Sequence, residues 1–200
     1  MPPESFATND PTVDTLVCCL SRELPPCEQS TALSFCYSAS KIDANSIGWL
    51  PKTAYDVRHT NGELLVCLNN EDLVGFVLMS KPSPYQELRC LQIWVRPDAR
   101  IILHGRHMLG VLENIAAERR CICLRCWCAE DLPSNLFWAA MGWHKKNWRL
   151  GPAKKPRRHN LYVKMLSPAR LSPFPTEPSK TGGFSPTTLS QPHLLGGAAV

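Results

Sequence analysis

The sequence has no long apolar run and no secretory leader. No uninterrupted apolar stretch approaches the roughly 20 residues that a membrane-spanning helix needs. The segment Met1–Asp10 is polar, and the apolar run Leu16–Leu20 is shorter than the hydrophobic region of a signal peptide. These absences argue against a membrane partner and predict a protein of the cytoplasm.

Acidic residues are missing from one long segment. Between Leu132 and Thr176 there is no Asp or Glu, whereas nine Lys and Arg fall there, in a chain of formal net charge +5. The positive charge is densest in a basic loop, residues 145–158, which includes Lys154-Lys155-Pro156-Arg157-Arg158. Such a loop attracts anionic ligands, RNA or acidic surfaces, although a solvated basic loop is the simpler interpretation.

The ten cysteines do not form a disulfide pattern. Most of them lie inside apolar runs, such as Cys67 in Leu-Leu-Val-Cys-Leu and Cys90 in Leu-Arg-Cys-Leu. A reduced cysteine packs as a small apolar residue. Together with the missing leader, these positions predict reduced cysteines in a reducing compartment.

Four of the cysteines are close enough to suggest a zinc site. Cys121, Cys123, Cys126 and Cys128 form C-x-C-x-x-C-x-C within one short apolar segment. Structural zinc sites place their thiolates on tight turns separated by a longer loop. A strand sends neighbouring side chains to opposite faces, so this segment is predicted to be a buried strand without a metal.

The spacing of apolar residues predicts a mixed α/β fold with helices on both faces of a sheet. Strands are expected at Thr12–Leu20, Glu63–Leu68, Leu73–Met79, Leu88–Val95, Cys121–Cys128, Trp143–Leu150 and Asn160–Leu166. Helices are expected at Cys27–Lys41, Leu50–His59, His104–Arg119 and Leu132–Met141. In the fourth strand, Cys90, Gln92 and Trp94 are expected to share one face. Residues 12–166 form one domain, whereas residues 1–11 and the Pro-, Ser- and Gly-rich tail 167–200 are predicted to be disordered.

The stretch from Val95 to Trp143 carries the clearest chemical signal. A strand ends in a basic, glycine-containing turn that opens a helix, and the first amides of a helix can hold a phosphate. This arrangement predicts a site for a nucleotide cofactor. The candidate backbone donors are Leu103, His104, Gly105, Arg106 and His107. The guanidinium groups of Arg100 and Arg106 would add charge-assisted hydrogen bonds.

Three motifs carry a resemblance to a known family. The first motif is Val95-x-Pro97-x-x-Arg100. The second is Arg100–Gly105, which stands where that family has Gln/Arg-x-x-Gly-x-Gly/Ala. Asp131–Trp138 and Met141-Gly142-Trp143 are similar to its final motif. In residues 27–166 the chain resembles the GCN5-related N-acetyltransferase (GNAT) superfamily, in a branch typical of bacteria and phages. The resemblance implies a mostly antiparallel central sheet that is splayed between its fourth and fifth strands.

The resemblance also implies the chemistry. The co-substrate would be acetyl-CoA with no metal, and the acceptor an amine of a small molecule or a protein. The pantetheine arm would enter the splayed gap, pair with the main chain near Ile93 and Val95, and bond to Asn135. The protein would act as a monomer or homodimer.

Three residues depart from the family pattern. Leu103 replaces a glycine of the loop, Trp138 stands where a tyrosine usually serves as the acid, and Gln92 stands where the strand often supplies a carboxylate base. Glu87 is then the remaining carboxylate candidate for the base, and a base that acts through water is the alternative. These departures leave a second hypothesis open, in which a catalytically inactive GNAT fold binds an acyl-CoA or RNA.

Overall fold

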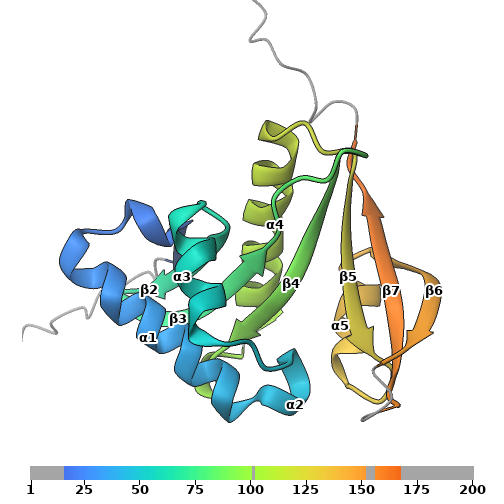
Figure 1. The fold of residues 1–200 in the computed structure, drawn as a ribbon, viewed down its shortest axis with the longest axis horizontal. Coiled ribbons are helices and arrows are strands. Elements are labelled where there is room, and N and C mark those ends of the chain that lie inside the picture. The colour runs from blue at the N-terminus through green and yellow to red at the C-terminus, as the bar shows by residue number, and fades with distance from the viewer. Residues whose placement is uncertain (1–15, 101, 152–155, 168–200) are drawn as a thin grey trace, which may run out of the picture.

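The computed structural model describes residues 16–100, 102–151 and 156–167 (Figure 1). The predictions for residues 1–11, for the tail beyond residue 167 and for Lys154 and Lys155 lie outside these ranges. The strands are β1 (Leu16–Leu20), β2 (Leu64–Asn69), β3 (Asp72–Met79), β4 (Glu87–Val95), β5 (Cys123–Ala129), β6 (His144–Leu150) and β7 (Arg158–Met165). The α-helices are α1 (Pro26–Ile42), α2 (Ala44–Ile47), α3 (Lys52–Thr60), α4 (Ile102–Glu118) and α5 (Ser134–Ala140). None of the helices in the described ranges is long and apolar enough to cross a membrane.

The seven strands form one sheet in the order β1-β2-β3-β4-β5-β7-β6. All neighbours are antiparallel except β4 and β5, which are parallel and are connected through α4. The parallel pairing joins residues 87–90 to residues 123–126 and then stops. Beyond that point the two strands diverge and leave a wedge in the sheet (Figure 1). The splay between the fourth and fifth strands and the predicted element order are confirmed, except that the short helix α2 was not predicted.

The helices cover both faces of the sheet, as expected. Helices α1 to α3 lie over one face, and α4 and α5 lie over the other (Figure 1). Two apolar cores result: one contains Tyr55, Phe76 and Trp94, and the other contains Met108 and Leu112 of α4. The 3.6-residue apolar spacing of α4 is what directs one stripe of this helix toward the sheet.

A β-bulge in β4 changes the predicted faces of that strand. Met79 pairs with Cys90, but Leu78 pairs with Gln92, so that Leu91 is an additional residue in the ladder. Cys90 therefore packs in the core under α4, whereas Trp94 packs in the core under α1. The prediction that Cys90, Gln92 and Trp94 share one face is wrong because a bulge shifts the alternation by one residue.

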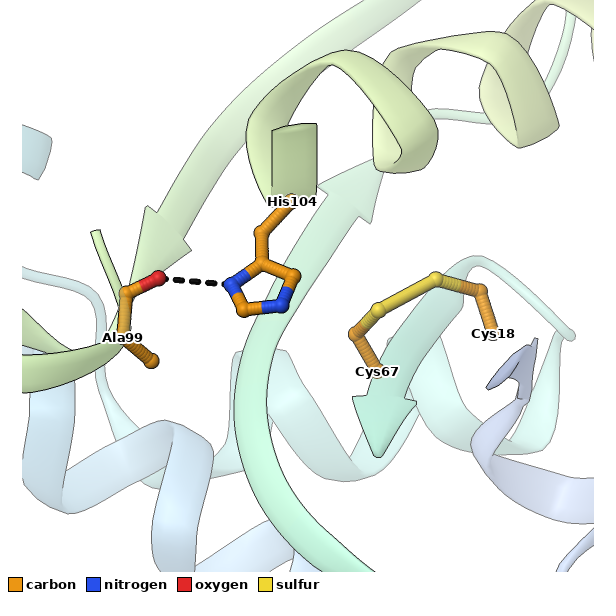
Figure 2. Close-up of a disulfide and its surroundings, with 4 residues drawn as sticks. All are labelled: Cys18, Cys67, Ala99 and His104. Carbon is orange, nitrogen blue, oxygen red and sulfur yellow. Dashed lines mark hydrogen bonds between the residues drawn. A yellow bond between two sulfur atoms is a disulfide. The ribbon is translucent and has the colours of Figure 1, made fainter. Parts of the chain in front are cut away.

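Cys18 and Cys67 form a disulfide between β1 and β2 (Figure 2). The two residues are direct partners in the antiparallel register, and their Cα atoms are 4.3 Å apart. The other eight cysteines are free. The prediction that every cysteine is reduced is therefore wrong for this pair, because the β1–β2 register brings together two residues that are 49 positions apart.

The cysteine-rich segment is a strand, as predicted. Cys123, Cys126 and Cys128 lie on β5, and all three are buried. Cys126 and Cys128 pack in the core under α4, and Cys121 precedes the strand. Within the described ranges, no group of three or more His, Cys, Asp or Glu side chains could hold a metal ion.

Candidate functional site

A cavity of about 460 Å³ lies in the wedge between β4 and β5. Its walls include Ile93 and Val95 of β4, Trp127 and Cys128 of β5, and Phe137 of α5. Residues of α2 and of the first turns of α4 also line it, although these helices cover opposite faces of the sheet. The cavity therefore passes through the sheet, from the helices on one face to the helix on the other.

The first turn of α4 borders this cavity. Because α4 begins at Ile102, the amides of Leu103 and His104 have no partner within the helix. The amides of Arg106 and His107 fall in the next turn, where they bond to carbonyls of the helix itself. The free amides are therefore those of the first turn, and the contact of the predicted donors with a phosphate stays a prediction.

The side chain of His104 holds this turn in place. Its buried ring donates a hydrogen bond from Nδ1 to the carbonyl oxygen of Ala99, at 2.6 Å (Figure 2). Because a carbonyl can only accept, the proton lies on Nδ1. Ala99 ends a short 3-10 turn, Pro97–Ala99, that follows β4. The hydrogen bond thus ties the end of β4 to the first turn of α4.

Gly105 allows α5 to approach α4 closely. A Cβ atom at this position would lie 3.0 Å from the ring of Phe137. Both residues line the cavity. The glycine predicted for the phosphate turn therefore also allows close packing beside the cavity, because a side chain there would press on the ring of Phe137.

The structure gives Arg100 partners within the protein. Its Nη2 lies 2.8 Å from Oδ2 of Asp43, and its Nε donates to the carbonyl of Val95. The same Asp43 oxygen accepts a hydrogen bond from Nε1 of Trp94. Arg100 lines the cavity and its side chain is 52% exposed, so contact with a ligand there would compete with the Asp43 ion pair. Its contact with a phosphate stays a prediction.

Asn135, the predicted contact of pantetheine, has a structural role in the fold. Its side-chain amide donates to the carbonyls of Ala129 and Leu132, and its Oδ1 accepts from Asn160 and Tyr162. Asn135 is also absent from the lining of the cavity. The structure does not support Asn135 as a cofactor ligand, because its donors and acceptor are used to join α5 to β5 and β7.

The structure does not support Glu87 as the base. Its carboxylate is paired with Arg125 at 2.6 Å, at the closed end of the wedge where β4 and β5 are still paired. It does not line the cavity. Gln92 is buried and fully bonded: Tyr55 donates to its Oε1, and its Nε2 donates to the carbonyls of Ile47 and Gly48.

Three thiols line the cavity, which the sequence alone did not indicate. They belong to Cys90, Cys126 and Cys128. Burial raises the pKa of Cys90 to about 12 and also raises the pKa of the other two thiols. All three therefore stay protonated at neutral pH and act as neutral wall groups. In the part of the chain that the structure describes, no His, Asp or Glu lines this cavity.

The basic loop is partly neutralised where the structure describes it. Arg157 forms a bidentate pair with Asp131 and also donates to the carbonyl of Asn45. Arg158 lies over the ring of Trp148 and pairs with Glu130. These contacts join the loop to α2 and to the end of β5, so Arg157 and Arg158 are used within the fold. The predicted contact with RNA through residues 145–158 gains no support from them.

Solved structures with the same fold share little sequence with this chain. The ribosomal-protein-S18-alanine N-acetyltransferase from Escherichia coli matches with a TM-score of 0.58 at 14% identity, over 76% of this chain and 95% of that chain. Ard1 from Thermoplasma volcanium matches with a TM-score of 0.63 at 14% identity, over 76% and 98%. The Salmonella typhimurium protein yncA, solved with its cofactor acetyl-CoA, matches with a TM-score of 0.60 at 11% identity, over 76% and 95%.

The sequence itself matches a family model over most of the described fold. No curated protein matches the sequence. Residues 29–143 match the model of the acetyltransferase (GNAT) family. This range begins in α1, includes the whole wedge between β4 and β5, and ends after α5. The match and the splayed sheet agree, and the chain therefore belongs to the GNAT acetyltransferase family.

Proposed function

We propose that this protein transfers the acetyl group of acetyl-CoA to the nitrogen of an amine. The observation that carries the proposal is the cavity between β4 and β5, which passes through the sheet beside the first turn of α4. One face can then receive the coenzyme while the acceptor enters from the other. The family assignment and the acetyl-CoA in yncA favour the same coenzyme.

The coenzyme would bind along the open edge of β4. Beyond Cys90 this edge has no strand partner, so the amides of a pantetheine arm can complete the ladder near Ile93 and Val95. The free amides of Leu103 and His104 and the positive end of the α4 dipole would bind the pyrophosphate. The exposed Arg106 stands in the next turn and can add a charge-assisted hydrogen bond.

The acceptor nitrogen would attack the thioester carbonyl directly. The new N–C bond forms, the C–S bond breaks, and the coenzyme leaves as a thiolate. A thiol pKa of about 8.5 lets this group leave without an acid, which suits Trp138 because an indole does not donate a proton at neutral pH. Among the described residues, none that lines the cavity is a carboxylate or an imidazole, so the amine proton would leave to water.

Without a base from the protein, the rate should follow the ionisation of the acceptor. For an alkylamine with a pKa near 10, kcat/KM should rise about tenfold per pH unit between about pH 6 and pH 8. The measurement is the dependence of kcat/KM on pH, with the reaction monitored by the release of the free thiol of the coenzyme. An amine of lower pKa serves as the control and should move the whole profile to lower pH. A plateau above about pH 7 with the alkylamine would show that the protein supplies a base.

Replacement of Gly105 by a larger residue should weaken binding of the coenzyme. In Gly105→Val the side chain would displace Phe137 into the cavity, and overpacking of this kind costs about 1–3 kcal/mol. We therefore expect the affinity for acetyl-CoA, measured by titration calorimetry, to fall about tenfold or more.

The matched control is Gly110→Ala in the same helix, where an added Cβ meets nothing within 4 Å. This variant should bind acetyl-CoA as the unchanged protein does and should be slightly more stable, because alanine favours a helix over glycine. Failure of the unchanged protein to bind acetyl-CoA at tens of micromolar would contradict the proposed function. Equal affinities for the Gly105 and Gly110 variants would contradict the proposed position of the coenzyme.

A further inference from the structure

A second cavity, of about 340 Å³, lies at the closed end of the wedge. The residues that line it include three arginines on three different strands, Arg89 of β4, Arg125 of β5 and Arg149 of β6. The neighbours of Arg125 on β5, Leu124 and Cys126, pack under α4. Because side chains alternate along a strand, Arg125 points to the opposite face, the one that α1 to α3 cover.

The lining of this cavity carries positive charge with little compensation. None of the seven residues that line it is acidic. Arg125 is paired with Glu87, which lies just outside the lining. Arg149 has its guanidinium 4.2 Å from the centre of the Trp127 ring, which leaves the edge of the guanidinium free to donate. In the described part of the chain, neither Arg89 nor Arg149 has an ion pair.

The arginine cavity adjoins the proposed reaction site. Cys90, Leu91, Cys126 and Trp127 line both cavities. These residues stand where the parallel pairing of β4 and β5 ends. A ligand with an anionic group among the arginines can therefore extend its other end into the wedge, from the face opposite α4.

We propose that the acceptor is a small primary amine that also carries a carboxylate or a phosphate, which Arg89, Arg125 and Arg149 bind. This inference rests on the proposed function and names the class of its acceptor. Arginine suits the task because its planar donors match both carboxylate and phosphate. The volume lies in the range of small-molecule sites. The anion would hold the molecule while its amine reaches the thioester.

The kinetic test compares each anionic amine with an uncharged counterpart. Aminohexanoate is paired with hexylamine and phosphoethanolamine with ethanolamine, so that the two pairs separate carboxylate from phosphate. We expect kcat/KM to be at least about tenfold higher for the anionic member of one or both pairs. Arg149→Gln should lower that value about tenfold, with little change for the uncharged amine or for the KM of acetyl-CoA.

Arg158→Gln is the matched control. Arg158 also lies over a tryptophan ring, that of Trp148, but it does not line either cavity. In this variant the kcat/KM values for all four amines should be unchanged. Equal kcat/KM values for charged and uncharged amines would overturn the proposal. So would an Arg149→Gln variant that changes the KM of acetyl-CoA alone, because the arginines would then bind the coenzyme.

A binding measurement keeps the test independent of turnover. The indole N–H signal of Trp127, assigned with Trp127→Phe, should shift in NMR spectra on titration with an anionic amine but not with its uncharged counterpart. In Arg149→Gln the shift should require about tenfold more ligand. A shift without any turnover would reject the proposed transfer while retaining the anion site. Turnover of amines without this shift would retain the transfer and reject the anion site.

Discussion

Reduction of the Cys18–Cys67 disulfide should lower the free energy of unfolding by about 4 kcal/mol. The bond closes a loop in which the two cysteines are 49 positions apart, and the loss of chain entropy in the unfolded state grows with the length of such a loop. In the sheet, β1 lies at an edge and forms its ladder with β2 alone. The disulfide therefore restrains a strand that has few other interactions within the sheet.

The measurement is denaturant unfolding with and without a reductant. The double variant Cys18→Ala, Cys67→Ala should resemble the reduced protein and should not respond to the reductant. Cys27→Ala is the control, since Cys27 is free and exposed, and this variant should keep the full response.

A count of thiols in denaturant gives an independent check on the same bond. Of the ten cysteines, the eight free ones should react before reduction and all ten afterwards. Ten reactive thiols before reduction would contradict the disulfide. An unfolding curve that reductant leaves unchanged would contradict its contribution to stability.

The fold could be predicted because its signals are local. The apolar stripe of α4 predicts a helix from His104 to Arg119, and the structure places it at Ile102–Glu118. The predicted ends of the helix differ from the observed ends by one or two residues, because the residues that cap a helix are not part of its apolar stripe. The splay between β4 and β5 was implied by the family motifs, which lie on both sides of the wedge. In contrast, the register of β1 on β2 leaves no local signal, and the disulfide depends on it.

The site was less predictable because its side chains have distant partners. Asn135 was implied by the family resemblance and Glu87 was the remaining carboxylate near β4, but in the fold Asn135 is bonded to Asn160 and Glu87 is paired with Arg125. The bulge at Leu91 adds one residue to β4, so the side chains beyond it point to the faces opposite to those that simple alternation predicts. The three arginines of the second cavity are on separate strands, and only the sheet order of β4, β5, β7 and β6 brings them together.

Replacement of Gln92 by Glu should destabilise the protein by about 3–5 kcal/mol at neutral pH, as expected for an uncompensated charge in the interior. The Gln92 side chain is buried, and its Nε2 donates to the carbonyls of Gly48 at 2.6 Å and of Ile47 at 3.2 Å. A carboxylate would instead direct an oxygen toward these two oxygens. Gln92→Glu therefore also tests whether this position of β4 can hold a charged base at all.

The matched control is Gln29→Glu. The Nε2 of Gln29 also donates to two carbonyls, those of Arg22 and Leu24, but the side chain is partly exposed. Water can solvate a carboxylate at this position, so the cost should be within about 1 kcal/mol. Denaturant unfolding of both variants measures the difference. Equal losses of stability would mean that burial of Gln92 contributes nothing beyond its hydrogen bonds.

The pH dependence of Gln92→Glu separates charge from shape. Burial and the two facing carbonyls both disfavour the charged form, so the pKa of the introduced carboxyl should be higher in the folded protein than its unfolded value of about 4.3. The folded state then binds the proton more tightly than the unfolded state. The deficit relative to the unchanged protein should therefore be largest at neutral pH and shrink as the pH falls toward about 4.3. A deficit that stays constant from about pH 7 to pH 4.5 would show that lost packing, and not charge, causes the destabilisation.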